Sequence, residues 1–302
     1  MYDIIIIGGG PAGLTAAVYA RRAEKSVLVI EKGTFGGQIT FSPKVENIPG
    51  FNLISGNEFA EKLVDQVLEQ GADMEALEVI ALRDDGEFKT VVTDDGEFTS
   101  KAVIIATGAK HRLLGLEREE EFIGNGISFC AVCDGAFYKD KTVAVIGGGN
   151  SALQEALLLS ELAKKVYVVQ NLDSLTGEEK LQKQIYDKEN VSIIVSSVVD
   201  SIIGESVFEG IMIKNTEKGE VSKLLLDGMF VAIGLIPQNE AFSDTVKLDE
   251  RGYVISDEFC KTNANGIFVA GDCRTKKIRQ VATAAADGAI AALAACEYAD
   301  TL

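Results

Sequence analysis

Apolar residues gather in short unbroken runs along the chain, and small residues follow each run. The first run, Tyr2 to Ile7, is β-branched and typical of a central parallel strand that is buried on both faces. An amphipathic helix is predicted through about Glu24, and a second apolar run follows from Val27 to Ile30. A strand, a helix and a strand in this order predict a parallel βαβ unit.

The same pattern returns in the middle of the chain. Thr142 to Ile146 is a second buried strand, Ala152 to Leu162 reads as a helix, and Val166 to Val169 reads as the next strand. Two such units in 302 residues predict an α/β protein with two Rossmann-like, three-layer nucleotide-binding domains.

The segments between and after these units indicate how the domains are divided. A further strand is predicted at Ala102 to Ile105, behind hairpin turns at Asp85-Gly86 and Asp94 to Gly96. After Pro237 the chain returns to the first domain, where a strand at Gly266 to Val269 precedes an alanine-rich helix. We therefore expect a discontinuous first domain of residues 1–111 and 241–302, and a second domain of residues 112–240.

The first glycine loop follows the first strand directly. Gly8, Gly10 and Gly13 fit GxGxxG, with Pro11 and Ala12 between them. Such glycines allow a tight turn and let backbone N–H groups approach a pyrophosphate at the N-terminus of a helix. Glu31, at the end of the second strand, is placed to accept a hydrogen bond from an adenosine ribose. The loop predicts a dinucleotide site, and the alternative is a close-packed strand-to-helix turn.

The second glycine loop, Gly147 to Ala152, fits GxGxxA, but the end of its second strand lacks the usual partners. An NAD site has an acid there for the ribose, and an NADP site has arginine for the 2′-phosphate. The residues here run from Gln170 to Thr176 with neither, and the nearest acid, Asp173, comes three positions late. This loop leaves open whether backbone groups suffice to hold a nucleotide.

A pair of cysteines, Cys130 and Cys133, lies between the two glycine loops and is followed at once by Asp134. Thiols three positions apart share one face of a helical turn, and a helix N-terminus lowers the pKa of the first thiol. Asp134 is a candidate proton donor and acceptor. Half of a zinc site is the alternative, but it needs two more ligands, and the remaining candidates are scattered: His111, Cys260, Cys273 and Cys296. The spacing favours a redox-active dithiol with no metal.

Composition narrows the function classes. A formal net charge of −17 disfavours nucleic acid and anionic membranes as main partners. No positively charged leader precedes an apolar segment, and no apolar run is expected to approach the length of a membrane span. Five cysteines, with one close pair, suit a reducing compartment. We expect a cytoplasmic protein.

Two further segments carry residues suited to a cofactor. A loop at residues 36–50 with little helix or strand character is long enough to be functional. Asp272, after the strand that ends at Val269, is able to bond a ribityl hydroxyl, and the alternative is a satisfied turn acid.

Taken in order, these elements resemble the low-molecular-weight thioredoxin reductases over nearly the whole length. The elements are the two glycine loops, Gly36-Gly37-Gln38, Ala106-Thr107-Gly108, the dithiol, and Gly271-Asp272 to Arg279-Gln280. The Cys-Ala-x-Cys-Asp-Gly element is the most specific part. The resemblance implies FAD bound by the first and last segments, a pyridine-nucleotide-type middle domain, thioredoxin as partner, and a homodimer whose middle domain rotates.

The resemblance also implies roles for single residues. Cys133 is expected to face the flavin, Cys130 to attack the thioredoxin disulfide, and Asp134 to protonate. The residues expected at FAD are Gly8, Gly10, Pro11, Ala12, Gly13, Glu31, Gly37, Gln38, Asn47, Thr107, Gly108, Gly271, Asp272, Arg279, Gln280 and Val281.

The arginines with which this family holds the NADPH 2′-phosphate are absent from the segment Gln170 to Thr176. In this respect the chain resembles the branch that takes electrons from reduced ferredoxin. Arg274, Lys276, Lys277 and Arg279 form a basic cluster that is expected to dock such an acidic partner. The intact second loop keeps NADH or NADPH as alternative donors. A flavin-binding, non-catalytic or zinc-stabilised interaction module is the alternative from another class.

Overall fold

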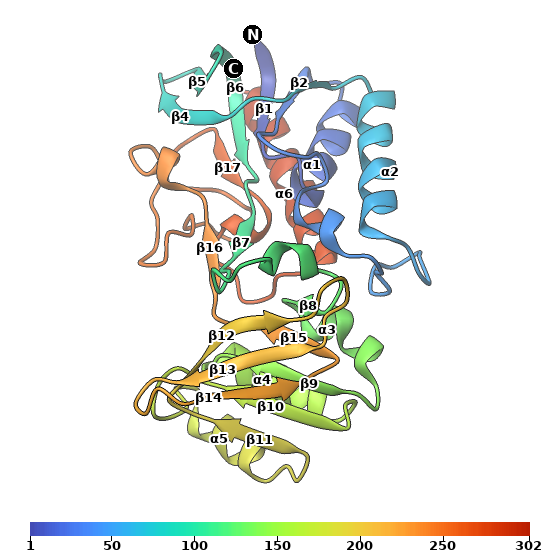
Figure 1. The fold of residues 1–302 in the computed structure, drawn as a ribbon. Coiled ribbons are helices and arrows are strands. Elements are labelled where there is room, and N and C mark those ends of the chain that lie inside the picture. Colours follow the sequence, from blue (N-terminus) through green and yellow to red (C-terminus); the bar gives the residue numbers. More distant parts are fainter. The chain divides into compact units, whose positions relative to one another are not determined.

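The structure is a computed structural model that describes residues 1–302, and the chain divides into two compact units. Unit 1 comprises residues 1–110 and 236–302, and unit 2 comprises residues 111–235. Both units are built around parallel strands, so the predicted α/β class is confirmed (Figure 1).

The sheet of unit 1 has seven strands in the order β3-β2-β1-β6-β5-β4, with β17 on the other side of β6. Parallel pairing joins β3, β2, β1, β6 and β17, whereas β4, β5 and β6 pair antiparallel through the two predicted hairpins. The strands are β1 (Tyr2–Ile7), β2 (Val27–Ile30), β3 (Asp73–Glu75), β4 (Val79–Asp84), β5 (Lys89–Thr93), β6 (Gly96–Ile105) and β17 (Ile267–Val269).

Helices cover only one face of this sheet. Ile4 and Ile6 point into a core shared with α1 (Pro11–Arg22) and α6 (Val281–Ala299), and α2 (Gly56–Glu69) packs beside α1 (Figure 1). Ile5 and Ile7 point into a second core that is covered by irregular chain around η4 (Glu240–Phe242). The continuous apolar run of β1 is therefore explained by burial on both faces.

The expectation that no apolar segment approaches a membrane span is wrong for α6. This helix of 19 residues is long and apolar enough to cross a bilayer by length and composition, and 39% of its apolar window is buried inside the protein. Gly288 lets this helix pack closely on α1, because a Cβ at that position would lie 2.2 Å from the carbonyl oxygen of Ala12. The core helix of a soluble protein passes the same test, so α6 is weak evidence for a membrane.

The main sheet of unit 2 is five-stranded, parallel and ordered β11-β10-β9-β15-β8. Two helices, α4 (Asn150–Ser160) and α5 (Glu179–Tyr186), share a core with one face. An antiparallel three-stranded sheet shares a core with the other face. The strands are β8 (Ile127–Ser128), β9 (Thr142–Ile146), β10 (Lys165–Val169), β11 (Val191–Ile194), β12 (Ser197–Ile203), β13 (Gly210–Asn215), β14 (Val221–Leu225) and β15 (Gly228–Val231).

The chain passes between the units at two short strands, β7 (Ala109–His111) and β16 (Leu235–Pro237), which pair with each other. The remaining elements are single turns: η1 (Gly37–Phe41), η2 (Glu119–Phe122), α3 (Ala131–Asp134), η3 (Gly135–Tyr138) and η5 (Gly271–Cys273). Three of these turns, η1, α3 and η5, carry residues expected at the cofactor or in the dithiol.

Candidate active site

The first glycine loop turns between β1 and α1 at positions that admit only glycine. Gly8 has φ +112°, and a Cβ there would lie 2.3 Å from the carbonyl oxygen of Ala106. A Cβ at Gly13 would lie 1.9 Å from the carbonyl oxygen of Gly8. Pro11 is the first residue of α1, and no side chain caps that helix. The N–H groups of its first turn are therefore available to an anion such as a pyrophosphate.

Glu31 lies beside this loop, at the end of β2. Its Oε2 accepts from the backbone N–H of Gly9 at 2.7 Å, and its Oε1 accepts from the N–H of Gly33 at 2.8 Å. Two backbone donors hold the carboxylate in place, and its remaining lone pairs are free to accept from ribose hydroxyls. The position is the one that the sequence predicts for the adenosine ribose.

Asp272, in η5, carries a buried oxygen with no hydrogen-bond partner. Its Oδ1 is buried and unpaired, and burial raises the pKa of this carboxyl. A buried acceptor without a donor is uncommon in folded proteins. A sugar-alcohol hydroxyl would supply that donor, so the residue fits the ribityl chain of FAD. The satisfied turn acid considered from the sequence does not describe it.

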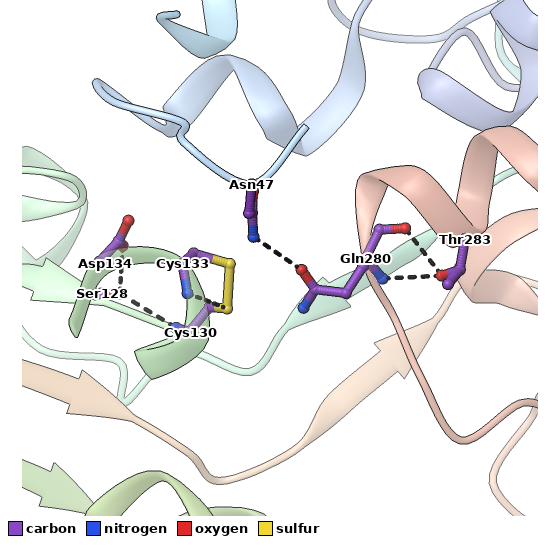
Figure 2. Close-up of a disulfide and its surroundings, with 7 residues drawn as sticks. All are labelled: Asn47, Ser128, Cys130, Cys133, Asp134, Gln280 and Thr283. Carbon is purple, nitrogen blue, oxygen red and sulfur yellow. Dashed lines mark hydrogen bonds between the residues drawn. A yellow bond between two sulfur atoms is a disulfide. The ribbon is translucent and has the colours of Figure 1, made fainter. Parts of the chain in front are cut away.

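The other residues expected at FAD come from both ends of the chain and meet within unit 1. Asn47 Nδ2 donates to Gln280 Oε1 at 3.2 Å, and Gln280 caps α6 together with Thr283 (Figure 2). Gln38 donates to the carbonyl oxygen of Ala109. The hydroxyl of Thr107 donates to Asn239 Oδ1 at 3.0 Å. Gly37, Gly108 and Gly271 have positive φ, Arg279 lies over the Tyr253 ring at 4.3 Å, and Val281 begins α6.

The second glycine loop has the same backbone turn as the first, but a different side chain lies beside it at the end of the next strand. Gly147 has φ +128°, and a Cβ there would lie 2.6 Å from the carbonyl oxygen of Ala232. A Cβ at Gly8 would meet the carbonyl oxygen of Ala106 in the same way. Gln170 takes the place of Glu31 at the strand end. Its amide oxygen accepts from the N–H of Asn171 at 3.2 Å, and its amide nitrogen donates to the carbonyl oxygen of Ser174 at 3.3 Å. Its side chain, 4% exposed, lies against Gly148.

Carboxylates near the second loop do not supply the missing ribose partner. Asp173 is exposed and accepts from the hydroxyl of Ser174 at 2.8 Å. Glu178 exchanges two hydrogen bonds with Asn150, the first residue of α4, at 2.7 and 3.1 Å. A negative charge therefore stands at the helix start where a dinucleotide phosphate is normally bound, which opposes binding of an anion.

The two thiols form a disulfide in the first turn of α3. Cys130 caps this turn, and its Sγ accepts from the backbone N–H of Cys133 at 3.2 Å (Figure 2). Both residues are half-buried, whereas Val132 between them is 65% exposed. A cystine closed over so few residues and reachable from solvent suits thiol exchange with a partner protein.

Asp134 is linked to the dithiol through Ser128. The Ser128 hydroxyl donates to Asp134 Oδ2 at 2.6 Å and accepts from the backbone N–H of Cys130 at 3.2 Å (Figure 2). Burial raises the pKa of the Asp134 carboxyl, against the opposing effect of the Ser128 hydrogen bond. The acid is thereby tuned to hold a proton nearer to neutral pH.

The zinc alternative finds no ligand set in the structure. No group of three His, Cys, Asp or Glu side chains is arranged to hold a metal ion. His111 stacks on Phe129 with ring centroids 4.5 Å apart. The other three cysteines, Cys260, Cys273 and Cys296, are buried and unpaired in unit 1.

The predicted basic docking cluster is wrong for two of its members. Arg274 Nη1 and Lys276 Nζ both pair with Asp287, at 3.1 and 2.7 Å, and their side chains are 11% and 10% exposed. Asp287 Oδ2 also accepts from the backbone N–H of Gly271 at 3.1 Å. These charges hold the η5 loop onto α6. Of the four basic residues, only Lys277 is exposed.

Sequence reasoning missed two acids, Asp287 and Glu155. Asp287 is the one charged residue in the alanine-rich stretch from Val281 to Cys296, and such an isolated charge is a usable signal of a buried ion pair. Glu155 lies on α4 among residues of ordinary helical pattern, and its burial gives no sequence signal.

The chain is similar to known proteins over nearly its whole length. A family model described as pyridine nucleotide-disulphide oxidoreductase matches residues 2–288. The chain is 42% identical to a thioredoxin reductase of Listeria monocytogenes, covering 100% of this chain and 95% of the relative. It is also 42% identical to a 34.2 kDa protein in the rubredoxin operon of Clostridium pasteurianum, over 98% and 96% of the two chains.

Among solved structures, the thioredoxin reductase from Streptococcus pyogenes is 40% identical, with a TM-score of 0.96 over 100% of this chain and 99% of that one. These likenesses extend over the glycine loops, the dithiol and η5 alike. The chain therefore belongs to the pyridine nucleotide-disulphide oxidoreductase family, as an FAD-containing flavoprotein that acts on disulfides.

Proposed function

We propose that this chain is a cytoplasmic, homodimeric thioredoxin reductase that receives its electrons from a reduced ferredoxin. The full-length likeness to thioredoxin reductases and the Cys130–Cys133 disulfide support the disulfide substrate. The observation that carries the donor assignment is Gln170, an amide bonded to its own loop at the place where a nucleotide domain normally presents an acid or an arginine.

The residues around the dithiol have separate tasks in this reaction. FAD, when bound, supplies the electron pair that reduces the disulfide. Cys133 is the thiol that receives electrons from the flavin, and Cys130, whose sulfur accepts from the N–H of Cys133, is the thiol that attacks thioredoxin. Asp134 gives and takes the proton, held by Ser128 at 2.6 Å. Val132, exposed between the two thiols, offers an apolar contact to the partner.

Binding of NADPH is opposed by both composition and charge. No arginine occurs from residue 170 to residue 178, so the 2′-phosphate would find no bidentate partner. Each lost charge-assisted hydrogen bond costs roughly 1.5–3 kcal/mol, and two or three such losses weaken binding by orders of magnitude. The carboxylate of Glu178 at the start of α4 adds repulsion.

The proposed docking face for ferredoxin is smaller than the sequence suggests. Around Arg274, Lys276 and Lys277, the exposed charge is Lys277, and Ile278 beside it is 56% exposed. A single cation next to an apolar side chain suits a transient partner with an acidic rim. Lys276 forms an internal ion pair with Asp287. Reversing its charge would therefore destabilise unit 1 and would not test docking.

NADH is the second candidate donor, because the backbone of the second glycine loop is intact at Gly147 and NADH lacks the 2′-phosphate. Anaerobic titration of the yellow protein with reduced ferredoxin, NADH and NADPH, followed by flavin absorbance, separates the three. We expect rapid bleaching with ferredoxin alone. Rapid bleaching by micromolar NADPH would overturn the donor assignment.

A charge reversal tests the docking face. Lys277→Glu should slow thioredoxin reduction driven by ferredoxin, and leave reduction driven by dithionite unchanged. Lys180→Glu, an equally exposed reversal on α5, is the matched control and should change neither rate. Equal ferredoxin-driven rates in the wild type and both variants would remove Lys277 from the docking face.

A further inference from the structure

Glu155 is a buried acid of unit 2 to which the reaction described above gives no role. It lies on α4, which packs against α3, the turn that carries the dithiol. Its Oε2 is buried and has no hydrogen-bond partner. The backbone N–H of Ala131 acts on the carboxyl as a hydrogen-bond donor, and Ala131 is the residue that directly follows Cys130.

Burial dominates the acidity of this carboxyl. It raises the pKa of Glu155 to about 8, against the opposing effect of the Ala131 N–H. The titratable side chains on elements next to α4 are Asp134 on α3, Tyr138 on η3, Lys165 and Tyr167 on β10, and Glu179, Lys180, Lys183 and Tyr186 on α5. None of them contributes to the shift, so no fixed countercharge compensates Glu155 when it ionises.

The first turn of α3 thus offers N–H donors both to the carboxyl of Glu155 and to the sulfur of Cys130, which becomes acidic once the disulfide is reduced. The N–H of Cys133 donates to the sulfur of Cys130 at 3.2 Å, and the N–H of Ala131 serves Glu155. Two negative charges against one buried turn repel strongly, because the surrounding medium screens them little.

We propose that Glu155 is a positioning residue for the dithiol, whose carboxyl takes up a proton when Cys130 becomes a thiolate, so that the turn holds one negative charge at a time. This rests on the proposed role of Cys130 and Cys133 as the redox pair. In the step, two electrons from the reductant break the S–S bond, one sulfur takes a proton to become a thiol, and Cys130 keeps the negative charge. Where Glu155 is ionised beforehand, it takes a second proton to become the neutral acid.

The proton count gives the test. Above a pH of about 8, Glu155 is ionised while the disulfide is closed, so reduction there consumes one proton more than it would without this residue. One extra proton changes the equilibrium constant tenfold per pH unit, which for two electrons is about 30 mV. Over the pH unit above 8, the midpoint potential of the dithiol should therefore fall more steeply in the wild type than in Glu155→Gln, by up to about 30 mV.

The holoprotein is equilibrated with dithiothreitol redox buffers at each pH, and Cys130 and Cys133 are quantified by alkylation and mass spectrometry. Glu161→Gln is the matched control, because Glu161 follows the same helix but is exposed and pairs with Lys188. It should keep the wild-type slope, and Glu155→Gln should lose the added steepness. Equal slopes for Glu155→Gln and the wild type would overturn the proposal.

A second measurement does not depend on the folding of the variant. Proton uptake by the wild-type protein during reduction, followed in weakly buffered solution with a pH dye, should rise toward one additional proton per dithiol above pH 8. Uptake that stays flat there overturns the role of Glu155. A pair that never exchanges with dithiothreitol would instead overturn the redox role of the two cysteines, which is a different failure.

Discussion

The backbone N–H of Gly9 donates to the carboxylate of Glu31 at 2.7 Å, where β1 turns into α1. In unit 2 the corresponding position is held by Gln170, whose side chain lies against Gly148 with both ends of its amide bonded to its own loop. A fixed carboxylate keeps lone pairs for ribose hydroxyls, whereas an amide bonded at both ends has less to offer. One chain therefore carries a complete and an altered version of the same nucleotide loop.

The first glycine loop should no longer bind FAD when a methyl group is added at Gly13. Gly13→Ala places a methyl group 1.9 Å from the carbonyl oxygen of Gly8, and relief of this clash must move the loop away from the pyrophosphate. We expect protein without yellow colour, measured as the flavin-to-protein absorbance ratio. Gly33→Ala is the control, because its Cβ would meet Glu31 at an ordinary 3.4 Å, and it should retain FAD. Full flavin content in Gly13→Ala would contradict this account of the loop.

The altered loop should recover NADPH affinity when arginines are added. Asn171 and Thr176 are exposed, so Asn171→Arg/Thr176→Arg adds two cations without disturbing the core. Each charge-assisted bond to the 2′-phosphate is worth roughly 1.5–3 kcal/mol, so NADPH should bind at least tenfold more tightly while NADH changes little. Isothermal titration with both nucleotides measures the difference. Asp187→Arg, beyond the end of α5, controls for net charge. A similar gain for both nucleotides would show that no 2′-phosphate contact had formed.

Much of this architecture is predictable from the chain, because strand, glycine loop and helix follow one another with local signals. The runs Tyr2 to Ile7 and Thr142 to Ile146 become β1 and β9 with the predicted bounds. The three-stranded sheet of unit 2 was not foreseen, although Asn215 and Gly219 mark the turn between β13 and β14. The covering of one face of the first sheet by irregular chain was not foreseen either.

Charge pairing was harder to predict than fold. Four basic residues within six positions predict a surface patch, yet Arg274 and Lys276 are only 11% and 10% exposed and pair with Asp287, which lies more than ten residues further along the chain. The partner of a charge is set by tertiary packing, and no local periodicity encodes it. The same holds for Glu155, whose unpaired oxygen follows only from the packing of α4 on α3.

The two thiols should differ when each is removed. Cys130→Ser leaves Cys133, proposed to face the flavin, as a free thiol, and its thiolate should give a long-wavelength absorption band next to the oxidised flavin. Cys133→Ser leaves Cys130, proposed to face thioredoxin, and should give no such band. Absorbance between neutral and alkaline pH distinguishes the two. Full thioredoxin reduction by both single variants would show that the pair is not the redox centre.

Asp287 should be a large contributor to the stability of unit 1. Asp287→Ala removes the carboxylate that pairs with Arg274 and Lys276, leaves these largely buried cations with neutral acceptors alone, and removes the acceptor of the Gly271 N–H. Loss of one member of a buried ion pair costs roughly 3–5 kcal/mol. Urea unfolding followed by flavin release should show this loss. Glu97→Ala removes an exposed pair with Arg83, whose side chain is 50% exposed, and should change the unfolding midpoint little, because solvent screens such a pair. Equal effects of the two variants would mean that the buried charges find other partners.

His111 should make unit 2 less stable in mild acid. Burial, with the ring stacked on Phe129, lowers the pKa of His111 from its ordinary value of 6.5 to about 4, so the folded form binds a proton less readily than the unfolded form. The free energy of unfolding therefore keeps its full value above pH 6.5 and decreases as the pH drops toward 4, by about 3 kcal/mol over that range.

His111→Phe keeps an aromatic ring on Phe129 and cannot titrate. Carboxyl groups titrate alike in both proteins, and His111 is the one histidine of the chain, so the difference between their urea midpoints isolates this residue. We expect the stability of His111→Phe relative to the wild type to increase steadily as the pH falls from 6.5 toward 4. A difference in urea midpoint that stays constant across this range would show that the imidazole is protonated without cost in the folded protein.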